Sequence, residues 1–323
     1  MKAFALISGG LDSALAAKLV KEQSIEVIGL RFKIPFGPNG SKSFSDLGIE
    51  IKEADISDDF LEMMKNPRYG YGSHMNPCID CKILMFRKSK EFMEQYNAKF
   101  IITGEVLGQR PMSQHKQALD AIAKRAGLEG LVLRPLSAKL LLETIPEKEG
   151  WIKREGLLSF SGRGRKQQIE LARIFGIKEY AQPAGGCLLT DPEFSKRLKD
   201  LMVHEGLSQD NIELLKIGRH FRVSEKAKLI VGRNEKENER LVNLAEERDY
   251  LFMPTDELAG PTSLGRGNFN EELIKLSCTI TCRYCDLNGN TNIDIVYRRI
   301  SEKENKVLKI SPIEETKLLS LRV

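Results

Sequence analysis

The chain has 323 residues, of which 41% are hydrophobic and 29% are charged, and its formal net charge is +5. This composition is typical of a soluble globular protein, and no apolar run is long enough to span a bilayer as a helix. The length predicts about two domains, and the modest positive charge permits an anionic partner without requiring one. Because the sequence starts directly on a predicted strand, without a recognisable targeting segment, we expect a cytoplasmic protein with no membrane partner.

The first half of the sequence alternates short apolar runs with helical patterns. Strands are predicted at residues 4–7, 26–30, 49–54, 100–103 and 131–133, and helices at residues 12–22, 82–95 and 113–126. This alternation indicates an α/β fold with a doubly wound parallel sheet, which binds its ligand at the carboxyl ends of its strands.

Beyond residue 190 the pattern changes to charged helical segments mixed with strands. Helices are predicted at residues 194–205, 212–215 and 235–247, and a strand leading to a turn at residues 228–234. The rest of the chain, through residues 294–297 and 306–310, is predicted to mix helix and strand. We therefore predict two domains, residues 1–192 with the parallel sheet and residues 193–323 as a second, smaller α+β domain.

The loop Ser8–Ser13, with the sequence SGGLDS, separates the first predicted strand from the first predicted helix. Backbone N–H groups at such a helix N-terminus can bind a phosphate, and two glycines allow the backbone to approach it closely. The Gly-Lys-Ser/Thr ending of a Walker A loop is absent. An ordinary tight turn is the alternative interpretation, but the order of these six residues favours a nucleotide site.

This loop resembles the PP-loop of adenylating ATPases, whose pattern SGGxDS it matches at each fixed position. The resemblance implies that ATP is cleaved between its α and β phosphates, leaving AMP on the acceptor, and that Asp12 orients Mg²⁺ or the phosphates. Arg31 and Phe32, at the end of the second strand, are predicted to flank adenine; the alternative is a solvated arginine and a core phenylalanine. The loop residues implied in nucleotide binding are Ser8, Gly9, Gly10, Leu11, Asp12 and Ser13.

Three of the six cysteines fall in the first predicted domain. Cys78 and Cys81 form a Cys-x-x-Cys pair just before a predicted helix, and Cys187 follows the glycine-rich segment 182–186. Such a pair chelates a metal or forms a redox disulfide. Two cysteines plus a third suggest either an iron–sulfur cluster with one open iron or a nucleophilic pair with a helper. Small buried cysteines are the alternative.

Three further motifs narrow the family. The stretch 103–109, TGEVLGQ, with Ser113 and Gln114, and the strand LRPL at 133–136 resemble the tRNA 4-thiouridine synthetases. The segment 76–81, NPCIDC, is similar to one in the tRNA 2-thiouridylases, and the combined resemblance covers about residues 1–190. It implies tRNA thiolation: ATP adenylates a uridine carbonyl oxygen, and sulfur then displaces AMP.

The same resemblance assigns further residues. Thr103, Gly104 and Gln109 would line the nucleotide site. Cys78, Cys81 and Cys187 would be catalytic and would hold a [4Fe–4S] cluster whose fourth iron carries sulfide. In the alternative mechanism Cys187 carries a persulfide that Cys78 or Cys81 resolves as a disulfide. Neither the N-terminal RNA-binding module nor the rhodanese extension of these synthetases is found here, so the resemblance identifies neither the modified uridine nor the sulfur donor. The donor is expected to be free sulfide or a persulfide carrier, and the lack of a carrier domain favours free sulfide.

Basic residues gather ahead of a predicted helix at 167–175. Arg163, Arg165 and Lys166, interleaved with glycines, are predicted to neutralise the phosphates of tRNA or of ATP. A solvated charged face is the alternative.

The C-terminal third carries a second resemblance. Residues 217–221 and 229–238, which include IVGRNEKEN, resemble the RNA-binding NFACT-R module over about residues 210–300. The resemblance implies that Arg219, His220 and Arg233 bind RNA, although a single histidine such as His220 is more often structural.

Cys278, Cys282 and Cys285 spell CxxxCxxC, the cluster motif of radical S-adenosylmethionine enzymes. In those enzymes the motif opens a barrel that needs about 200 further residues, which do not follow here. We predict packing cysteines that share one face of a helix, with an accessory metal site as the alternative.

Together these features predict an ATP-dependent tRNA sulfurtransferase that uses ATP, Mg²⁺ and a [4Fe–4S] cluster. Three alternatives remain open: thiolation without a cluster, an RNA-binding adaptor with a regulatory nucleotide loop, and a PP-loop enzyme that acts on a small molecule.

Overall fold

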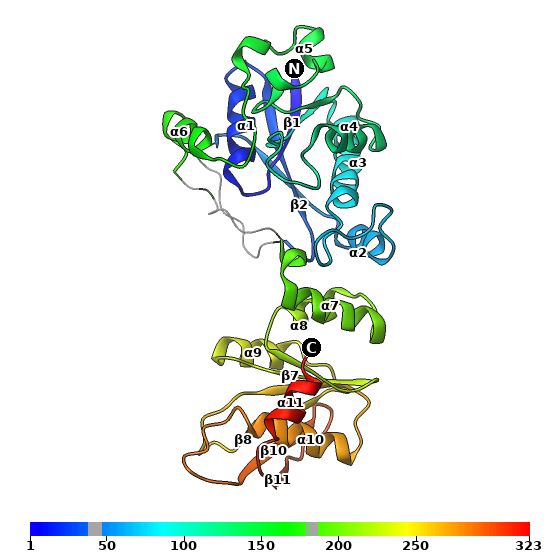
Figure 1. Ribbon diagram of the computed structural model, residues 1–323, viewed down its shortest axis with the longest axis vertical. Helices are drawn as coiled ribbons and strands as arrows, with labels where there is room; N and C mark the ends of the chain where they lie inside the picture. The colour runs from blue at the N-terminus through cyan, green and yellow to red at the C-terminus, as the bar shows by residue number, and fades with distance from the viewer. Residues whose placement is uncertain (38–46, 179, 181–186) are drawn as a thin grey trace. The chain divides into compact units, whose positions relative to one another are not determined.

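The computed structural model describes residues 1–37, 47–178, 180 and 187–323 (Figure 1). Within this part of the chain two compact units are present, Met1–Thr190 and Asp191–Val323. No helix in the described residues has the length and apolar character needed to cross a membrane.

The N-terminal unit is built on five parallel strands in the order β3-β2-β1-β4-β5. The strands are β1 (Lys2–Leu6), β2 (Glu26–Lys33), β3 (Ile51–Asp55), β4 (Phe100–Ile102) and β5 (Val132–Leu133). The α-helices are α1 (Leu11–Lys21), α2 (Ser57–Lys65), α3 (Cys78–Tyr96), α4 (Lys116–Arg125), α5 (Ile145–Lys148) and α6 (Lys166–Ile174). The short 3₁₀ segments are η2 (Ala138–Leu140), η3 (Arg154–Gly156) and η4 (Leu188–Thr190).

Helices cover both faces of this sheet (Figure 1). On β1, Ala3 and Ala5 pack with α1 and α6, whereas Phe4 points to the opposite face and meets Phe92 and Tyr96 of α3 edge-on. A strand that is apolar on both faces is expected where helices lie above and below a parallel sheet. The predicted α/β fold with a doubly wound parallel sheet is confirmed.

The strand order reverses direction between β1 and β4, the two strands that precede the SGGLDS and TGEVLGQ loops. Ligands of such sheets bind at the carboxyl edge where the order reverses. The fold therefore brings the two motifs to the position at which a nucleotide site is expected.

The C-terminal unit contains a six-stranded antiparallel sheet in the order β11-β10-β8-β9-β7-β6. Its strands are β6 (Arg219–Ser224), β7 (Ala227–Val231), β8 (Tyr250–Pro254), β9 (Ser263–Gly267), β10 (Ile293–Arg299) and β11 (Lys306–Ile310). Its helices are α7 (Pro192–His204), α8 (Gln209–Leu215), α9 (Glu235–Asn243), α10 (Glu271–Cys282) and α11 (Glu315–Leu321). This separate sheet confirms the predicted second, smaller α+β region.

The side chains of β7 point alternately to the two faces of this sheet, and helices pack on both faces. Leu229 and Val231 pack with α10 on one face, and Ile230 packs with α8 and α9 on the other. Side chains of a strand point alternately to its two faces, so an apolar strand can serve two hydrophobic clusters at once.

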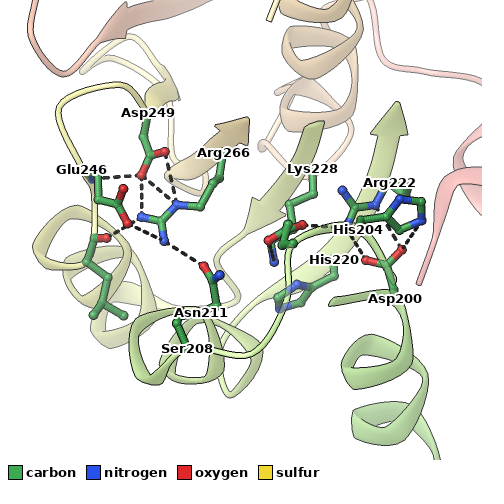
Figure 2. Close-up of polar contacts among 12 residues, drawn as sticks. Asp200, His204, Ser208, Asn211, His220, Arg222, Lys228, Glu246, Asp249 and Arg266 are labelled. Atoms are coloured by element: carbon green, nitrogen blue, oxygen red, sulfur yellow. Dashed lines mark hydrogen bonds and ion pairs between the residues drawn. The ribbon is translucent and has the colours of Figure 1, made fainter. Parts of the chain in front are cut away.

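Two ion networks join the helices of this unit to its sheet (Figure 2). Arg222 of β6 pairs with Asp200 of α7 and, at 2.7 Å, with Glu205, whose other oxygen lies 2.8 Å from the buried Lys228 Nζ. In the second network, Arg266 Nη2 donates to the fully buried Asp249 at 2.6 Å. Buried charges of this kind require partners, and here the partners come from different elements.

Several elements were missed, and two helix starts were misplaced. Helices α2, α5 and α11 and the strands β6, β8 and β9 were not predicted. The Cys-x-x-Cys pair lies in the first turn of α3, not before it. Helix α4 begins at Lys116, three residues later than predicted, because the ring of His115 accepts a hydrogen bond from the Ala118 N–H and caps the helix there.

Candidate functional site

The loop after β1 adopts the conformation of an anion-binding turn. Gly9 has φ +87°, which glycine adopts without strain. The Ser13 hydroxyl donates to the Gly10 carbonyl at 2.8 Å and accepts from the Ser8 N–H at 3.3 Å, so the two serines close the loop. Helix α1 starts at Leu11 without a side-chain cap. Its first N–H groups and its positive dipole end can therefore serve an anion.

The loop after β4 lies directly against this turn. A Cβ on Gly104 would come within 2.4 Å of the Asp12 carbonyl carbon and of the Ser13 nitrogen, so only glycine allows this approach. Gln109 Nε2 donates to Asp12 Oδ2 at 3.1 Å. The structure thus brings together Asp12, Gly104 and Gln109, which the sequence assigned to one site from two distant motifs.

Arg165 is the third contributor. Its Nη2 lies 4.0 Å from Asp12 Oδ1, and its side chain is 23% exposed. Its neighbours Arg163 and Lys166 are exposed. The three basic residues were predicted to act together, but they differ in position: of the three, only Arg165 reaches the loop after β1.

Arg31 and Phe32, predicted to flank adenine, stand at the end of β2. Arg31 Nη1 pairs with Glu53 Oε1 at 2.9 Å across to β3. Phe32 is half-buried and packs edge-on against Phe92 of α3, with ring centroids 6.4 Å apart. These contacts favour the alternative of a packed phenylalanine, and the role in adenine binding stays a prediction.

A buried ion triad of Lys82, Glu105 and Arg134 lies next to the site, and the sequence analysis did not predict it. Glu105 is 6% exposed and accepts from Lys82, from Arg134 Nε at 2.9 Å and from the Thr103 hydroxyl at 3.2 Å. Burial alone would raise the pKa of Glu105, but the charges of Lys82 and Arg134 outweigh it and lower this pKa to about 2. The signal in the sequence was Arg134, a charged residue within the otherwise apolar stretch LRPL.

This triad links the predicted cysteine site to the predicted nucleotide site. Lys82 directly follows Cys81 on α3, and Glu105 directly follows Gly104, which packs on the loop after β1. Because a buried ion triad is held by several hydrogen bonds at once, it fixes the first turn of α3 relative to the nucleotide-type loop.

The structure places Cys187 near the Cys78–Cys81 pair. The Met75 N–H donates to the Leu189 carbonyl at 3.2 Å, which ties the chain before α3 to η4, immediately after Cys187. The glycine-rich segment 182–186 ahead of Cys187 lies outside the described residues. All three thiols are half-buried.

Burial is the main influence on the acidity of two of these thiols. Burial, and then the neighbouring Cys187 and Cys78, raise the pKa of Cys81 to about 12, against the opposing charges of Lys82 and Arg110. Burial also raises the pKa of Cys187. Three soft sulfur donors beside cations suit a thiolate-ligated iron cluster in their chemistry. However, no three His, Cys, Asp or Glu residues among those described lie close enough to hold a single metal ion.

In the C-terminal unit, the residues predicted to bind RNA separate into different environments. His220 is 3% exposed, and its Nε2 lies 2.9 Å from the Ile217 carbonyl. Burial, followed by the charges of Lys228 and Arg197, lowers the pKa of His220 well below its usual value. The ring of His220 is therefore buried, and its contact with RNA stays a prediction.

Arg233 remains accessible, with 45% of its side chain exposed, although it pairs with Glu237 at 2.7 Å. Arg219 stacks over the ring of Tyr284, 4.7 Å from its centroid. Glu237 also accepts from the backbone N–H groups of Arg233 and Gly218. Much of the GRNEKEN motif therefore stabilises the connection between β7 and α9.

Cys278 and Cys282 are fully buried in the cluster between α10 and the sheet. Helix α10 ends at Cys282, so Cys285 lies beyond it and does not share one helical face with the other two, as had been predicted. The burial of Cys278 and Cys282 agrees with a packing role.

Comparisons with known proteins support both resemblances. Residues 1–139 match the family described as Thiamine biosynthesis protein (ThiI), and residues 218–321 match the family described as NFACT protein RNA binding domain. The two resemblances found in the sequence are thus confirmed. The first match is shorter than the residues 1–190 expected from the motifs.

The chain is also similar to curated tRNA-modifying enzymes. It is 33% identical over 104 residues to tRNA-specific 2-thiouridylase MnmA 1 of Fusobacterium nucleatum, covering 30% of this chain and 29% of that protein. It is 31% identical over 113 residues to tRNA-specific 2-thiouridylase MnmA of Sulfurimonas denitrificans, covering 31% and 33%. The chain therefore spans about a third of the length of these relatives.

Among solved structures, a 4-thiouridine synthetase–RNA complex with bound ATP is 21% identical, with a TM-score of 0.34 and coverage of 55% of this chain and 51% of that one. The C-terminal part of the fibronectin/fibrinogen-binding protein of Streptococcus suis is 10% identical, with a TM-score of 0.30 and coverage of 76% and 94%. Both TM-scores are too low to support an argument about fold or function.

Proposed function

We propose that this chain, which combines a ThiI-like region with an NFACT-type RNA-binding region, is an ATP-dependent tRNA sulfurtransferase. Residues 1–192 would carry out the chemistry, and residues 193–323 would contribute to tRNA binding. The observation that supports this most is the convergence of the SGGLDS and TGEVLGQ loops where the strand order reverses. Since the substrate would be tRNA, a cytoplasmic location remains the expectation.

In the first half-reaction the loop after β1 would bind the phosphates of ATP at the N-terminus of α1. A uridine carbonyl oxygen attacks the α phosphorus, the bond to the β phosphate breaks, and pyrophosphate leaves. Asp12, held by Gln109, would orient Mg²⁺, whose preferred ligands are carboxylate and phosphate oxygens. The adenylated carbon of uridine is then open to attack by sulfur.

In the second half-reaction sulfur bonds to that carbon, and AMP leaves with the former carbonyl oxygen. Cys78, Cys81 and Cys187 would hold the [4Fe–4S] cluster; when bound, such a cluster supplies an open iron that can carry sulfide. The positive charges of Lys82 and Arg110 partly oppose the rise that burial causes in the pKa of Cys81. Burial of the thiols would limit the access of water and oxygen.

A cluster-free mechanism is the alternative, and it would use the same three cysteines. In that mechanism the outer sulfur of a persulfide on Cys187 bonds to the adenylated carbon, and AMP leaves. The thiolate of Cys78 or Cys81 then attacks the inner sulfur of Cys187, which breaks the S–S bond, releases the thiouridine and forms a disulfide that an external thiol must reduce. The sulfur donor would be free sulfide in the first mechanism and a persulfide carrier in the second.

The test is tRNA-dependent AMP formation by Asp12→Asn. We expect loss of activity by about 100-fold or more, as for other groups that position charge in a transition state. The matched control is Asp120→Asn on the exposed side of α4, which should retain full activity. Full turnover by Asp12→Asn would remove the SGGLDS loop from the mechanism. ATP cleavage that needs no RNA would instead favour a small-molecule substrate.

A further inference from the structure

We propose that Arg165 binds the phosphate groups of ATP and belongs to the nucleotide site, while its exposed neighbour Arg163 faces tRNA. This inference rests on the proposed function and decides between ATP and tRNA phosphates as partners of the basic segment. Arg165 lies outside residues 1–139, the part of the chain that matches the ThiI family.

The backbone before Arg165 is fixed to the TGEVLGQ loop. Ser161 forms an isolated parallel bridge with Leu107, and the Gly162 N–H donates to the Leu107 carbonyl at 2.8 Å. Gly162 has φ +77°, which turns the chain toward the site. The Leu107 N–H in turn donates to the Ser137 hydroxyl at 2.9 Å. The segment is thus held against the loop after β4 by backbone contacts.

The side chain of Arg165 points to the loop after β1. Its Nη2 lies 4.0 Å from Asp12 Oδ1, which is too long for a hydrogen bond. Arg165 Nε and Asp12 Oδ1 are both buried, and neither has a hydrogen-bond partner in the described part of the chain. Leaving such groups unpaired costs free energy, so two unpaired groups facing one loop indicate a site prepared for a ligand.

The chemistry of these groups selects the ligand. A guanidinium presents a planar fork of donors that matches two phosphate oxygens, and a phosphate at the N-terminus of α1 would lie beside it. Asp12 would hold Arg165 near this position before nucleotide binds, and Gln109 would keep Asp12 in place from the other side. A metal ion between Asp12 and the phosphates would remove their mutual repulsion.

Arg163 differs from Arg165 in its exposure, the property that decides whether a large partner such as tRNA can reach it. It is exposed, whereas Arg165 is mostly covered and lies against Asp12. The backbone of a folded RNA contacts basic groups that reach the surface, and it contributes affinity through each phosphate that they neutralise. The two arginines, only two residues apart, therefore provide a matched pair for the experiment.

The experiment is calorimetric titration of the full chain with Mg-ATP and with inorganic pyrophosphate, and a separate measurement of tRNA binding. Arg165→Gln should raise the Kd of both small ligands by about 10- to 100-fold, as expected for loss of a charged hydrogen bond, and leave tRNA affinity unchanged. Arg165→Lys should restore part of the loss. Arg163→Gln should leave both small ligands unaffected and weaken tRNA binding.

Suppose that wild type binds ATP and pyrophosphate and that folded Arg165→Gln binds both with the same affinity. This result would overturn the assignment of Arg165 and leave the proposed function standing. Weaker tRNA binding by Arg165→Gln with normal ATP binding would overturn it in favour of an RNA contact. If wild type binds neither ATP nor pyrophosphate, the proposed function fails, and this inference fails with it. Circular dichroism and the melting temperature of each variant establish that it is folded.

Discussion

The two cysteine groups of this protein share a Cys-x-x-Cys spacing, at Cys78–Cys81 and at Cys282–Cys285, but differ in what surrounds them. Cys78 and Cys81 lie in the first turn of α3, half-buried, with Cys187 brought beside them from a segment about 100 residues away in sequence. Cys278 and Cys282 lie on the last turns of α10, fully buried against the sheet.

Thiol acidity alone does not separate the groups. The pKa of Cys81 is raised to about 12, and those of Cys278 and Cys285 are raised to the same value, in each case mainly by burial. The difference lies in the neighbours, because Lys82 and Arg110 place positive charge beside Cys81. Spacing shows where cysteines cluster, whereas accessibility and nearby charge indicate which cluster can react.

The largest expected effect tests this comparison directly. Cys187→Ala should reduce tRNA thiolation to background and remove iron and acid-labile sulfide from anaerobically purified protein, because one of three cluster ligands is lost. Cys278→Ala is the matched control: it should retain iron and thiolation, at a stability cost of about 1 kcal/mol for one small buried group.

Iron that survives Cys187→Ala and disappears in Cys278→Ala would reverse the comparison and assign the cluster to the C-terminal group. Wild-type protein that holds no iron after anaerobic reconstitution, yet loses thiolation in Cys187→Ala, would favour the persulfide mechanism.

A second, smaller effect concerns the ion triad beside Cys81. Glu105→Gln leaves Lys82 and Arg134 without their buried partner and should destabilise the N-terminal unit by about 3–5 kcal/mol. The exposed Glu53, which pairs with Arg31, is the control, and Glu53→Gln should cost less than about 1 kcal/mol. Urea unfolding followed by fluorescence measures this, because Trp151 is the single tryptophan and packs on Phe100 in this unit.

The stability of wild type and of Glu105→Gln should also depend differently on pH, in a direction that can be checked. The pKa of Glu105 is lowered from 4.5 to about 2 in the folded state. Its ionised form therefore stabilises the fold above pH 4.5, and that contribution is lost as the pH falls toward 2. The difference in unfolding free energy between wild type and Glu105→Gln should shrink across this range. A difference that stays constant would show that the carboxylate is not held by Lys82 and Arg134.

The smallest expected effect separates Arg233 from His220 in the C-terminal unit. Arg233→Gln should weaken tRNA binding a few-fold and reduce the slope of log affinity against log salt by about 1, as for one phosphate contact. His220→Gln should leave tRNA affinity unchanged in folded protein, because the ring is buried. Fluorescence anisotropy at several salt concentrations distinguishes them. If His220→Gln binds tRNA more weakly and its melting temperature is unchanged, His220 contributes to RNA binding after all.

The amino-acid sequence alone determined the five strands of the N-terminal unit and the position of its two motif-bearing loops, although it missed helix α2. Backbone conformation follows from short-range patterns, such as the apolar run before Ser8–Ser13 and the two glycines within it. The same local patterns located the Cys-x-x-Cys pair but misplaced it by one turn, because Pro77 and not Cys81 precedes the helix.

Only the tertiary structure decided which side chains meet. Gln109 and Asp12 are 97 residues apart, and Arg134 and Glu105 are 29 apart, so no local pattern pairs them. It also separated Arg165 from Arg163 and buried His220, since exposure depends on the element that packs over a residue. Local sequence selects backbone conformation, whereas contacts between distant segments arise from how the apolar faces of those elements pack together.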